Sequence, residues 1–277
     1  MSKKANVNTE VQDNEEFILD SRLTTKQVII FTSNEGGVQK STNADKLVSA
    51  LREEGYRVAF FDADAENAYS NFRKYQNDSQ NDALKGCQAF DVNKNPELVI
   101  DAADIEADFI VFDMGANKMT EAVSGFGAID KFFRSFDKSV QCTFAVPLSN
   151  DKCPRSFSTI YEWLEDIPSS KLRAKVRVAS IINTGVMQQN DDLLSKTMNA
   201  YNESDVVKSI KKETDKFDFI EVEQTTQYDT NGHVKALLKS NNVQTVKDIV
   251  DDQSRTVRFI LRDHFDDAEI LMKSIIK

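Results

Sequence analysis

The sequence is short of the residues that mark several protein classes. Nine glycines, four prolines and one tryptophan among 277 residues exclude a collagen-like, a proline-rich or a repeat-propeller protein. No apolar run approaches the roughly 18 residues of a transmembrane helix. Three cysteines without C-x-x-C spacing and two histidines offer few zinc ligands, so we expect buried free thiols at Cys87, Cys142 and Cys153.

Positive charge is also scarce. Lysine and arginine number 35 against 45 acidic residues, a net charge of −10, so general attraction to nucleic acid or to an anionic membrane is not expected. The first four residues are followed by polar residues and not by an apolar segment, unlike a secretory signal. We therefore expect a cytoplasmic protein with no membrane partner.

The remaining composition predicts a globular α/β protein. Residues 1–25 are polar and acidic and predict a flexible tail, and residues 26–277 predict a single domain. Short β-rich runs alternate with helical patterns, which is typical of a mainly parallel sheet with helices on both faces. The predicted strands are 27–33, 57–62, 108–113, 141–147, 175–182 and 217–222. The first predicted helix begins near Ser41, and Gly55 stands where the C′ residue that ends it belongs. The other predicted helices are 66–76, 96–106, 119–136, 154–166, 191–212 and 252–276.

A loop with two glycines joins the first predicted strand to the first helix. It reads Asn34-Glu35-Gly36-Gly37-Val38-Gln39-Lys40-Ser41-Thr42. In such a loop the backbone N–H groups and the helix N-terminus hold phosphate oxygens, a lysine reaches the outer phosphates and a hydroxyl binds magnesium. Lys40 and Ser41 fit the last two roles, although Asn34 and Gln39 stand where the usual G-x-x-x-x-G-K-[ST] pattern has glycine.

Carboxylates follow two further strands. Asp62 and Asp64 come at the end of the second predicted strand. Asp113 ends the third, whose apolar run 109–112 predicts a strand covered on both faces. Because ligands of open parallel sheets bind beyond the carboxyl ends of the strands, these side chains and the glycine loop are expected to converge. One carboxylate can hold a magnesium-bound water and another can orient the attacking water in phosphoryl transfer.

These segments together resemble the ParA/MinD superfamily of deviant Walker A ATPases, whose loop reads K-G-G-x-G-K-[ST]. Residues 35–41 match this loop, Asp62-Ala63-Asp64 matches the family's D-x-D segment, and Asp113 ends its Walker B strand. The run 179–183 is similar to the strand whose asparagine meets adenine. The resemblance covers residues 27–190, and the segments after Asp64 and Asp113 are most similar to the plasmid conjugation and maintenance branch.

The resemblance implies an ATP site with magnesium and assigns roles residue by residue. Lys40 would act on the phosphates and Asp64 on the attacking water, as the catalytic pair. The nucleotide-binding set would be Gly36, Gly37, Val38, Gln39, Lys40, Ser41, Thr42 and Asn183, with Asn183 at the base, and the magnesium set would be Ser41, Asp62 and Asp113.

One departure concerns the signature lysine, which in this family crosses a dimer interface to the partner's nucleotide. Here that position holds Glu35, an anion where a cation should meet phosphate. Gln39 also adds a side chain where close backbone approach favours glycine. Either another lysine substitutes, with Lys118 as a candidate, or activation across a dimer has been lost.

Three functions follow as alternatives. The first is a nucleotide switch, a homodimer with slow ATP hydrolysis that works with an adaptor protein in plasmid or DNA partition, maintenance or conjugation. The second is a non-catalytic binding or assembly module with a degenerate nucleotide site. The third is a small-molecule kinase, which needs an arginine-rich substrate lid, and the sequence shows no such cluster of arginines. Local groups of basic residues could contact DNA phosphates, or they could form ordinary solvated helix faces. These residues are Lys208, Lys211, Lys212, Lys235 and Lys239.

Overall fold

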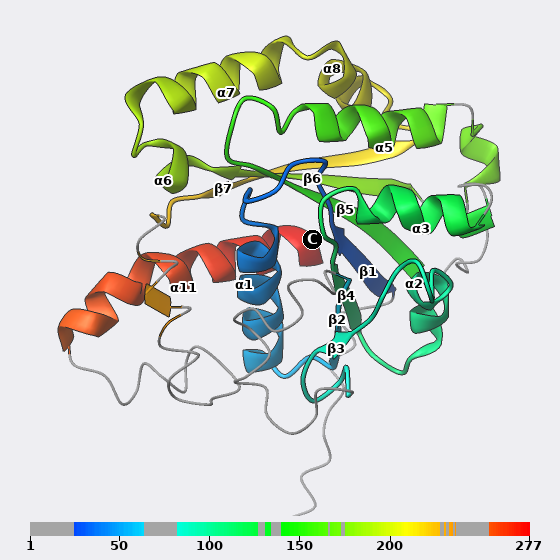
Figure 1. The fold of residues 1–277 in the computed structure, drawn as a ribbon, viewed down its shortest axis with the longest axis horizontal. Helices are drawn as coiled ribbons and strands as arrows, with labels where there is room; N and C mark the ends of the chain where they lie inside the picture. The colour runs from blue at the N-terminus through cyan, green and yellow to red at the C-terminus, as the bar shows by residue number, and fades with distance from the viewer. Residues whose placement is uncertain are drawn as a thin grey trace, which may run out of the picture.

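Seven parallel strands form one sheet in the order β3-β2-β4-β1-β5-β6-β7 (Figure 1). The computed structural model of the chain describes residues 25–63, 82–126, 131–133, 140–165, 167–172, 175–227, 230, 233–234, 236 and 255–277. The predicted α/β fold with a mainly parallel sheet is confirmed. The strands are β1 (Lys26–Phe31), β2 (Val58–Asp62), β3 (Gln88–Ala89), β4 (Phe109–Asp113), β5 (Val140–Leu148), β6 (Val176–Asn183) and β7 (Phe217–Gln224).

Helices cover both faces of this sheet, as Figure 1 shows. Helices α1 (Lys40–Glu53) and α11 (Arg255–Ile276) pack side by side on one face. The other face carries α3 (Lys118–Phe126), α5 (Arg155–Glu165), α7 (Asp191–Glu203) and α8 (Asp205–Lys212). The short helices are α2 (Leu98–Asp101), η1 (Ala102–Asp104), η2 (Ser169–Lys171) and α6 (Thr184–Met187).

The apolar runs of the central strands explain this arrangement. All five residues of β4 are buried, and successive side chains point to opposite faces of the sheet. Ile110 and Phe112 join the core under α3 and α5, whereas Phe109 and Val111 join the core under α1 and α11. A strand with two buried faces has no polar side, which is why its sequence does not alternate.

Helix α1 ends as its sequence predicts. Gly55 has φ +84°, and its N–H donates to the Arg52 carbonyl while the Tyr56 N–H donates to the Leu51 carbonyl. This is the hydrogen-bond pattern of a Schellman cap, in which glycine takes the left-handed position without a Cβ clash. The predicted role of Gly55 is therefore confirmed.

Two predicted helices are wrong in extent. The predicted helix 191–212 is two helices, because Ser204 takes an extended conformation and its hydroxyl accepts a hydrogen bond from the Val207 N–H. A serine that caps the following helix can end one helix and begin the next without any glycine or proline. The predicted helix 96–106 consists of α2 followed by η1.

Several predictions fall partly or wholly outside the described residues. The predicted helix 66–76 and residues 1–24 of the predicted tail lie there, and α3 covers only the first part of the predicted helix 119–136. The division into a tail and a single domain stays a prediction. Strand β3 and helix α6 were not predicted, since two and four residues are too few to show a period.

Candidate functional site

The glycine loop between β1 and α1 has the backbone form of an open turn. Gly37 and Gln39 have φ angles of 70° and 69°, both in the left-handed region. Gly36 and Gly37 are exposed, and a Cβ added to either would meet no atom within 4 Å. Lys40 is the first residue of α1, and its Nζ donates to the main-chain oxygen of Glu35 at 2.8 Å. The loop therefore curves back over the start of the helix.

Two hydroxyls and an amide fasten the beginning of this loop to α5. The Ser156 hydroxyl lies 3.1 Å from the Ser33 hydroxyl and accepts from the Asn34 N–H at 3.0 Å. The Asn34 side chain donates to the Thr159 hydroxyl at 2.9 Å. Asn34 thus has a contact that glycine could not make, which gives a structural reason for the departure from the phosphate-loop pattern.

Asp62 and Asp113 lie next to each other at the ends of adjacent strands. They are register partners in the β2–β4 pair, and Asp113 is also the register partner of Phe31 in β1. Residues at alternate positions share a face, so both aspartates lie on the face to which Phe60, Val111 and α1 belong. Both are buried. Two carboxylates are therefore presented on the side of the sheet that the loop and α1 occupy.

The side chains of this site offer oxygen ligands of the kind that magnesium binds. Ser41 in the first turn of α1 offers a hydroxyl, and Asp62 and Asp113 offer carboxylate oxygens, the ligands that Mg²⁺ takes together with phosphates and water. Within the described part of the chain, no group of three or more His, Cys, Asp or Glu could hold a metal on its own. Asp64, predicted beside the attacking water, lies outside the described residues.

Asn183, predicted at the base, ends β6 and is buried among protein partners. Its Nδ2 donates to the Leu148 carbonyl at 3.2 Å and to the Ser149 hydroxyl at 3.1 Å. Its Oδ1 accepts from Asn43 Nδ2 at 3.2 Å. The structure therefore brings Asn183 to the loop through Asn43, a residue of α1 that the sequence analysis did not identify.

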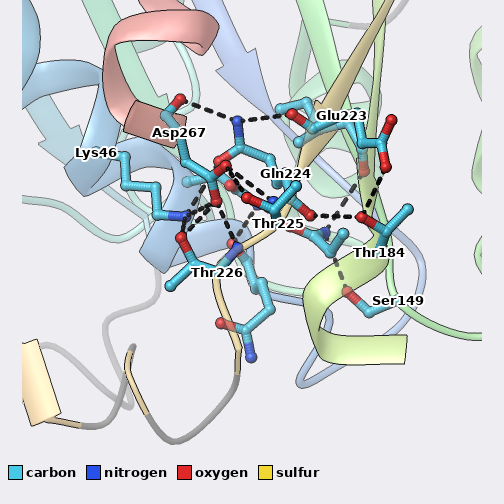
Figure 2. A network of polar contacts seen from close by, with 12 residues as sticks. Lys46, Ser149, Thr184, Glu223, Gln224, Thr225, Thr226 and Asp267 are labelled. Atoms are coloured by element: carbon cyan, nitrogen blue, oxygen red, sulfur yellow. Dashed lines mark hydrogen bonds and ion pairs between the residues drawn. The ribbon is translucent and has the colours of Figure 1, made fainter. Parts of the chain in front are cut away.

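A second buried polar network lies beside the site and joins α1, the end of β7 and α11 (Figure 2). Lys46 Nζ lies 2.9 Å from Asp267 Oδ2 and also donates to Gln224 Oε1 and to the Thr226 hydroxyl. The N–H groups of Thr225 and Thr226 donate to the same carboxylate at 2.8 Å. Lys46 and Asp267 look like ordinary helix residues in the sequence, so no local pattern could have found this network.

Three of the basic residues predicted as alternatives form ion pairs in the structure. Lys118 lies 2.8 Å from Glu121 in α3, Lys208 lies 3.6 Å from Asp205, and Lys211 bonds Glu221 at 3.0 Å. Lys235 and Lys239 lie outside the described residues. Lys118 and Lys208 pair within their own helices, whereas Glu221 lies in β7. Neither a substitute lysine nor a DNA surface follows from these contacts.

Two compositional predictions can be checked directly. Cys87, Cys142 and Cys153 are buried and free, as expected, and burial raises the pKa of the Cys142 and Cys153 thiols. In the part of the chain that the structure describes, no helix is both long enough and apolar enough to cross a membrane.

Comparison with known proteins places the chain in a family. The profile of the CobQ/CobB/MinD/ParA nucleotide binding domain matches residues 29–225. No curated protein matches the chain significantly in sequence.

Three solved structures of low sequence identity are similar to the chain over most of its length. Cyanothece apo McdA is similar over 90% of this chain and 99% of its own, with 12% identity and a TM-score of 0.51. Aquifex aeolicus MinD, from a MinC:MinD complex, is similar over 90% and 96%, with 16% identity and a TM-score of 0.46. The pnob8 ParA structure covers 91% and 97%, with 13% identity and a TM-score of 0.47.

Proposed function

The chain belongs to the CobQ/CobB/MinD/ParA nucleotide-binding family, and we propose that it binds ATP with magnesium at the loop 34–42 and acts as a nucleotide-dependent switch. One observation carries this proposal. Lys40 and Ser41 open α1 directly after the left-handed turn at Gly37 and Gln39, while Asp62 and Asp113 stand in register on the face that α1 covers.

The chemistry of these groups supports the proposal. The N-terminus of an α-helix presents backbone N–H groups that have no acceptor within the helix, together with the positive end of the helix dipole, and both favour phosphate. The Lys40 ammonium is buried beside the loop, with its 2.8 Å bond to the Glu35 carbonyl, and it supplies the charge for the outer phosphates. In the proposed complex the remaining contacts come from the loop residues Gly36, Gly37, Val38, Gln39 and Thr42.

Ser41, Asp62 and Asp113 would hold the magnesium ion, which when bound neutralises part of the phosphate charge. Asp64 would orient the attacking water, and the family resemblance suggests that hydrolysis is slow. The family resemblance further suggests a homodimer, an adaptor protein and work in plasmid or DNA partition, maintenance or conjugation in the cytoplasm.

A non-catalytic binding or assembly module is the second candidate, and the loop itself favours it at two positions. Glu35 places a carboxylate where the resemblance requires a lysine, so a partner's phosphate would meet negative charge. Gln39 holds a side chain on a left-handed backbone position where glycine would be unstrained. Such a module would bind nucleotide for stability and would not turn it over.

Thermal unfolding with and without ATP and magnesium tests the proposal. A ligand that binds only the folded state stabilises it by about 2.7 kcal/mol at a hundredfold excess over Kd, which raises the melting temperature by several degrees in a protein of this size. Lys40→Ala should abolish the rise. Lys196→Ala removes an exposed lysine that pairs with Asp192 at 3.5 Å and should keep it, as the matched control.

The outcomes separate the two candidates. Asp64→Ala should keep the thermal rise and stop phosphate release, because the phosphate loop stays intact. A rise without any phosphate release in the unmutated protein would favour the non-catalytic module. No rise at millimolar ATP in the unmutated protein would end the proposal of a nucleotide site.

A further inference from the structure

We propose that Asn183 and Asn43 are positioning residues for the phosphate loop, and that Asn183 does not read the nucleotide base. Together with Ser149 they form a buried relay, defined here as the Ser149–Asn183–Asn43 relay, which holds two consecutive loop carbonyls. The inference rests on the proposed function for its ligand, but the contacts of the relay are present in the protein itself.

The relay touches the loop at both of its ends. The Ser149 hydroxyl donates to the Val38 carbonyl at 3.1 Å. At the other end, Asn43 Nδ2 donates to the Gln39 carbonyl at 3.0 Å. Asn183 connects the two, with Nδ2 on the Ser149 hydroxyl at 3.1 Å and Oδ1 on Asn43 Nδ2 at 3.2 Å. Three side chains therefore tie the last two residues of the loop to the ends of β5 and β6.

The Asn183 carboxamide is already committed to these partners. An asparagine NH₂ has two hydrogens, and Asn183 Nδ2 has the Ser149 hydroxyl and the Leu148 carbonyl as acceptors. Its Oδ1 accepts from Asn43, and only 3% of the residue is exposed. To bond a base edge with Nδ2, Asn183 would have to break bonds that are buried, and a buried group left unpaired is costly.

Pinning these carbonyls has a direct effect on the phosphate-binding groups. In a trans peptide the C=O and the next N–H point in opposite directions. When the Val38 carbonyl faces the Ser149 hydroxyl, the Gln39 N–H faces away from it, where phosphate oxygens are expected. The Gln39 carbonyl accepts from the Asn43 N–H at 2.9 Å as well as from the Asn43 side chain, so helix α1 and the relay together direct the Lys40 N–H. The second bond also falls on Gln39, which holds an unfavourable φ of 69° and needs its surroundings to keep it there.

Binding measurements with three ligands separate positioning from base recognition. ATP, GTP and inorganic tripolyphosphate, each with magnesium, would be titrated into the unmutated protein and into Asn183→Ala, Asn43→Ala and Ser149→Ala. We expect each substitution to weaken the binding of all three ligands by a similar factor. The factor should be about tenfold for a substitution that removes two hydrogen bonds. The ratio of ATP to GTP affinity should stay unchanged.

Asn190→Ala is the matched control. Asn190 caps α7, with its side chain accepting from the Asp192 N–H, so the same chemical change removes a hydrogen bond far from the loop in sequence. Asn190→Ala should lower the melting temperature without weakening any ligand. If Asn43→Ala fails to fold, Ser149→Ala carries the test, because it removes one hydroxyl and leaves both asparagines in place.

Base recognition would show a different pattern and would overturn the inference. In that case Asn183→Ala would leave tripolyphosphate binding unchanged and would bring the ATP and GTP affinities together.

Hydrogen exchange measured without ligand tests the relay independently of the proposed nucleotide site. Hydrogen exchange at the amides of residues 38–42 should quicken in Asn183→Ala and Asn43→Ala but not in Asn190→Ala. Faster exchange in a protein that binds no nucleotide would sustain the relay and refute the nucleotide site, and unchanged exchange would refute the relay.

Discussion

The Lys46 ammonium and the Asp267 carboxylate lie 2.9 Å apart, and their side chains are only 2% and 0% exposed. Lys46 belongs to α1, whose first turn forms the proposed phosphate site, and Asp267 belongs to the last helix, α11 (Figure 2). Burial lowers the pKa of Lys46, so its charge depends on this partner. The pair therefore fastens the two helices that cover one face of the sheet.

Breaking this pair from one side should be far more costly than removing both charges. We expect Asp267→Leu to lower the free energy of unfolding by about 3–5 kcal/mol, because it leaves a buried lysine unpaired. The double variant Lys46→Met/Asp267→Leu should lose clearly less. Urea unfolding of the two single variants and the double variant measures the difference.

The exposed pair of Lys273 and Glu269 on α11 provides the control for that cycle. Glu269→Gln should change stability by about 0–1 kcal/mol, as is usual for a surface ion pair. A double variant at Lys46 and Asp267 that loses as much stability as the two single variants added together would contradict the proposed dependence.

Acid should weaken the fold through Asp267. Burial alone would raise its pKa, but the Lys46 ammonium and the N–H and O–H donors of Thr225 and Thr226 outweigh burial and hold the pKa below its usual value. The folded state then binds fewer protons than the unfolded state near pH 4, so stability present above that pH is lost as the pH falls. Urea unfolding from pH 7 to pH 2 tests this. At pH 7 the Asp267→Asn variant should be less stable than the unmutated protein, and its free energy of unfolding should fall less as the pH is lowered. Parallel curves for the two proteins would show that Asp267 does not contribute.

The layout of the fold could be predicted because its signals are local. The apolar run 109–112 indicates a strand buried on both faces, and Gly55 indicates the end of α1, and both are confirmed. The break at Ser204 was missed because a serine within a helical pattern is ambiguous. Only the extended conformation of that residue distinguishes a cap from a solvent-facing side chain.

The site could be predicted only in part, for a related reason. Asp62 and Asp113 are predicted to lie close together because the carboxyl ends of parallel strands lie at the same end of the sheet. The register confirms that they are neighbours. The contact of Asn43 with Asn183 spans 140 positions of the chain. No periodicity connects two such residues, so the relay and the Lys46–Asp267 pair become visible only when the chain is folded.

Gln39 should be replaceable by glycine with a gain. Its φ of 69° costs a residue with a side chain roughly 1–2 kcal/mol, and glycine relieves this strain. Glycine also gives the unfolded chain more conformational freedom, which offsets part of the gain. We expect Gln39→Gly to raise the free energy of unfolding by about 0.5 kcal/mol and to tighten ATP binding. Gln39→Val, with a β-branched side chain, should lower stability. Urea unfolding and ATP titration of both variants measure this, and a destabilised Gln39→Gly would mean that the Gln39 side chain makes a contact worth more than the strain.

Glu35 should oppose nucleotide-dependent assembly by its charge. Its main-chain oxygen holds Lys40 and its N–H donates to the Ser33 hydroxyl, and both contacts survive a change of side chain. Glu35→Gln removes the anion and should tighten ATP binding severalfold, since one unit charge about 4 Å from phosphate in water is worth about 1 kcal/mol. Glu35→Lys adds the cation that the family resemblance requires, so it should also raise ATP-dependent dimerisation or phosphate release above the level of Glu35→Gln. Light scattering with ATP and magnesium and a phosphate-release assay compare the two variants. Equal dimerisation and equal turnover in all three proteins, with ATP still bound, would show that position 35 plays no part in coupling nucleotide to assembly.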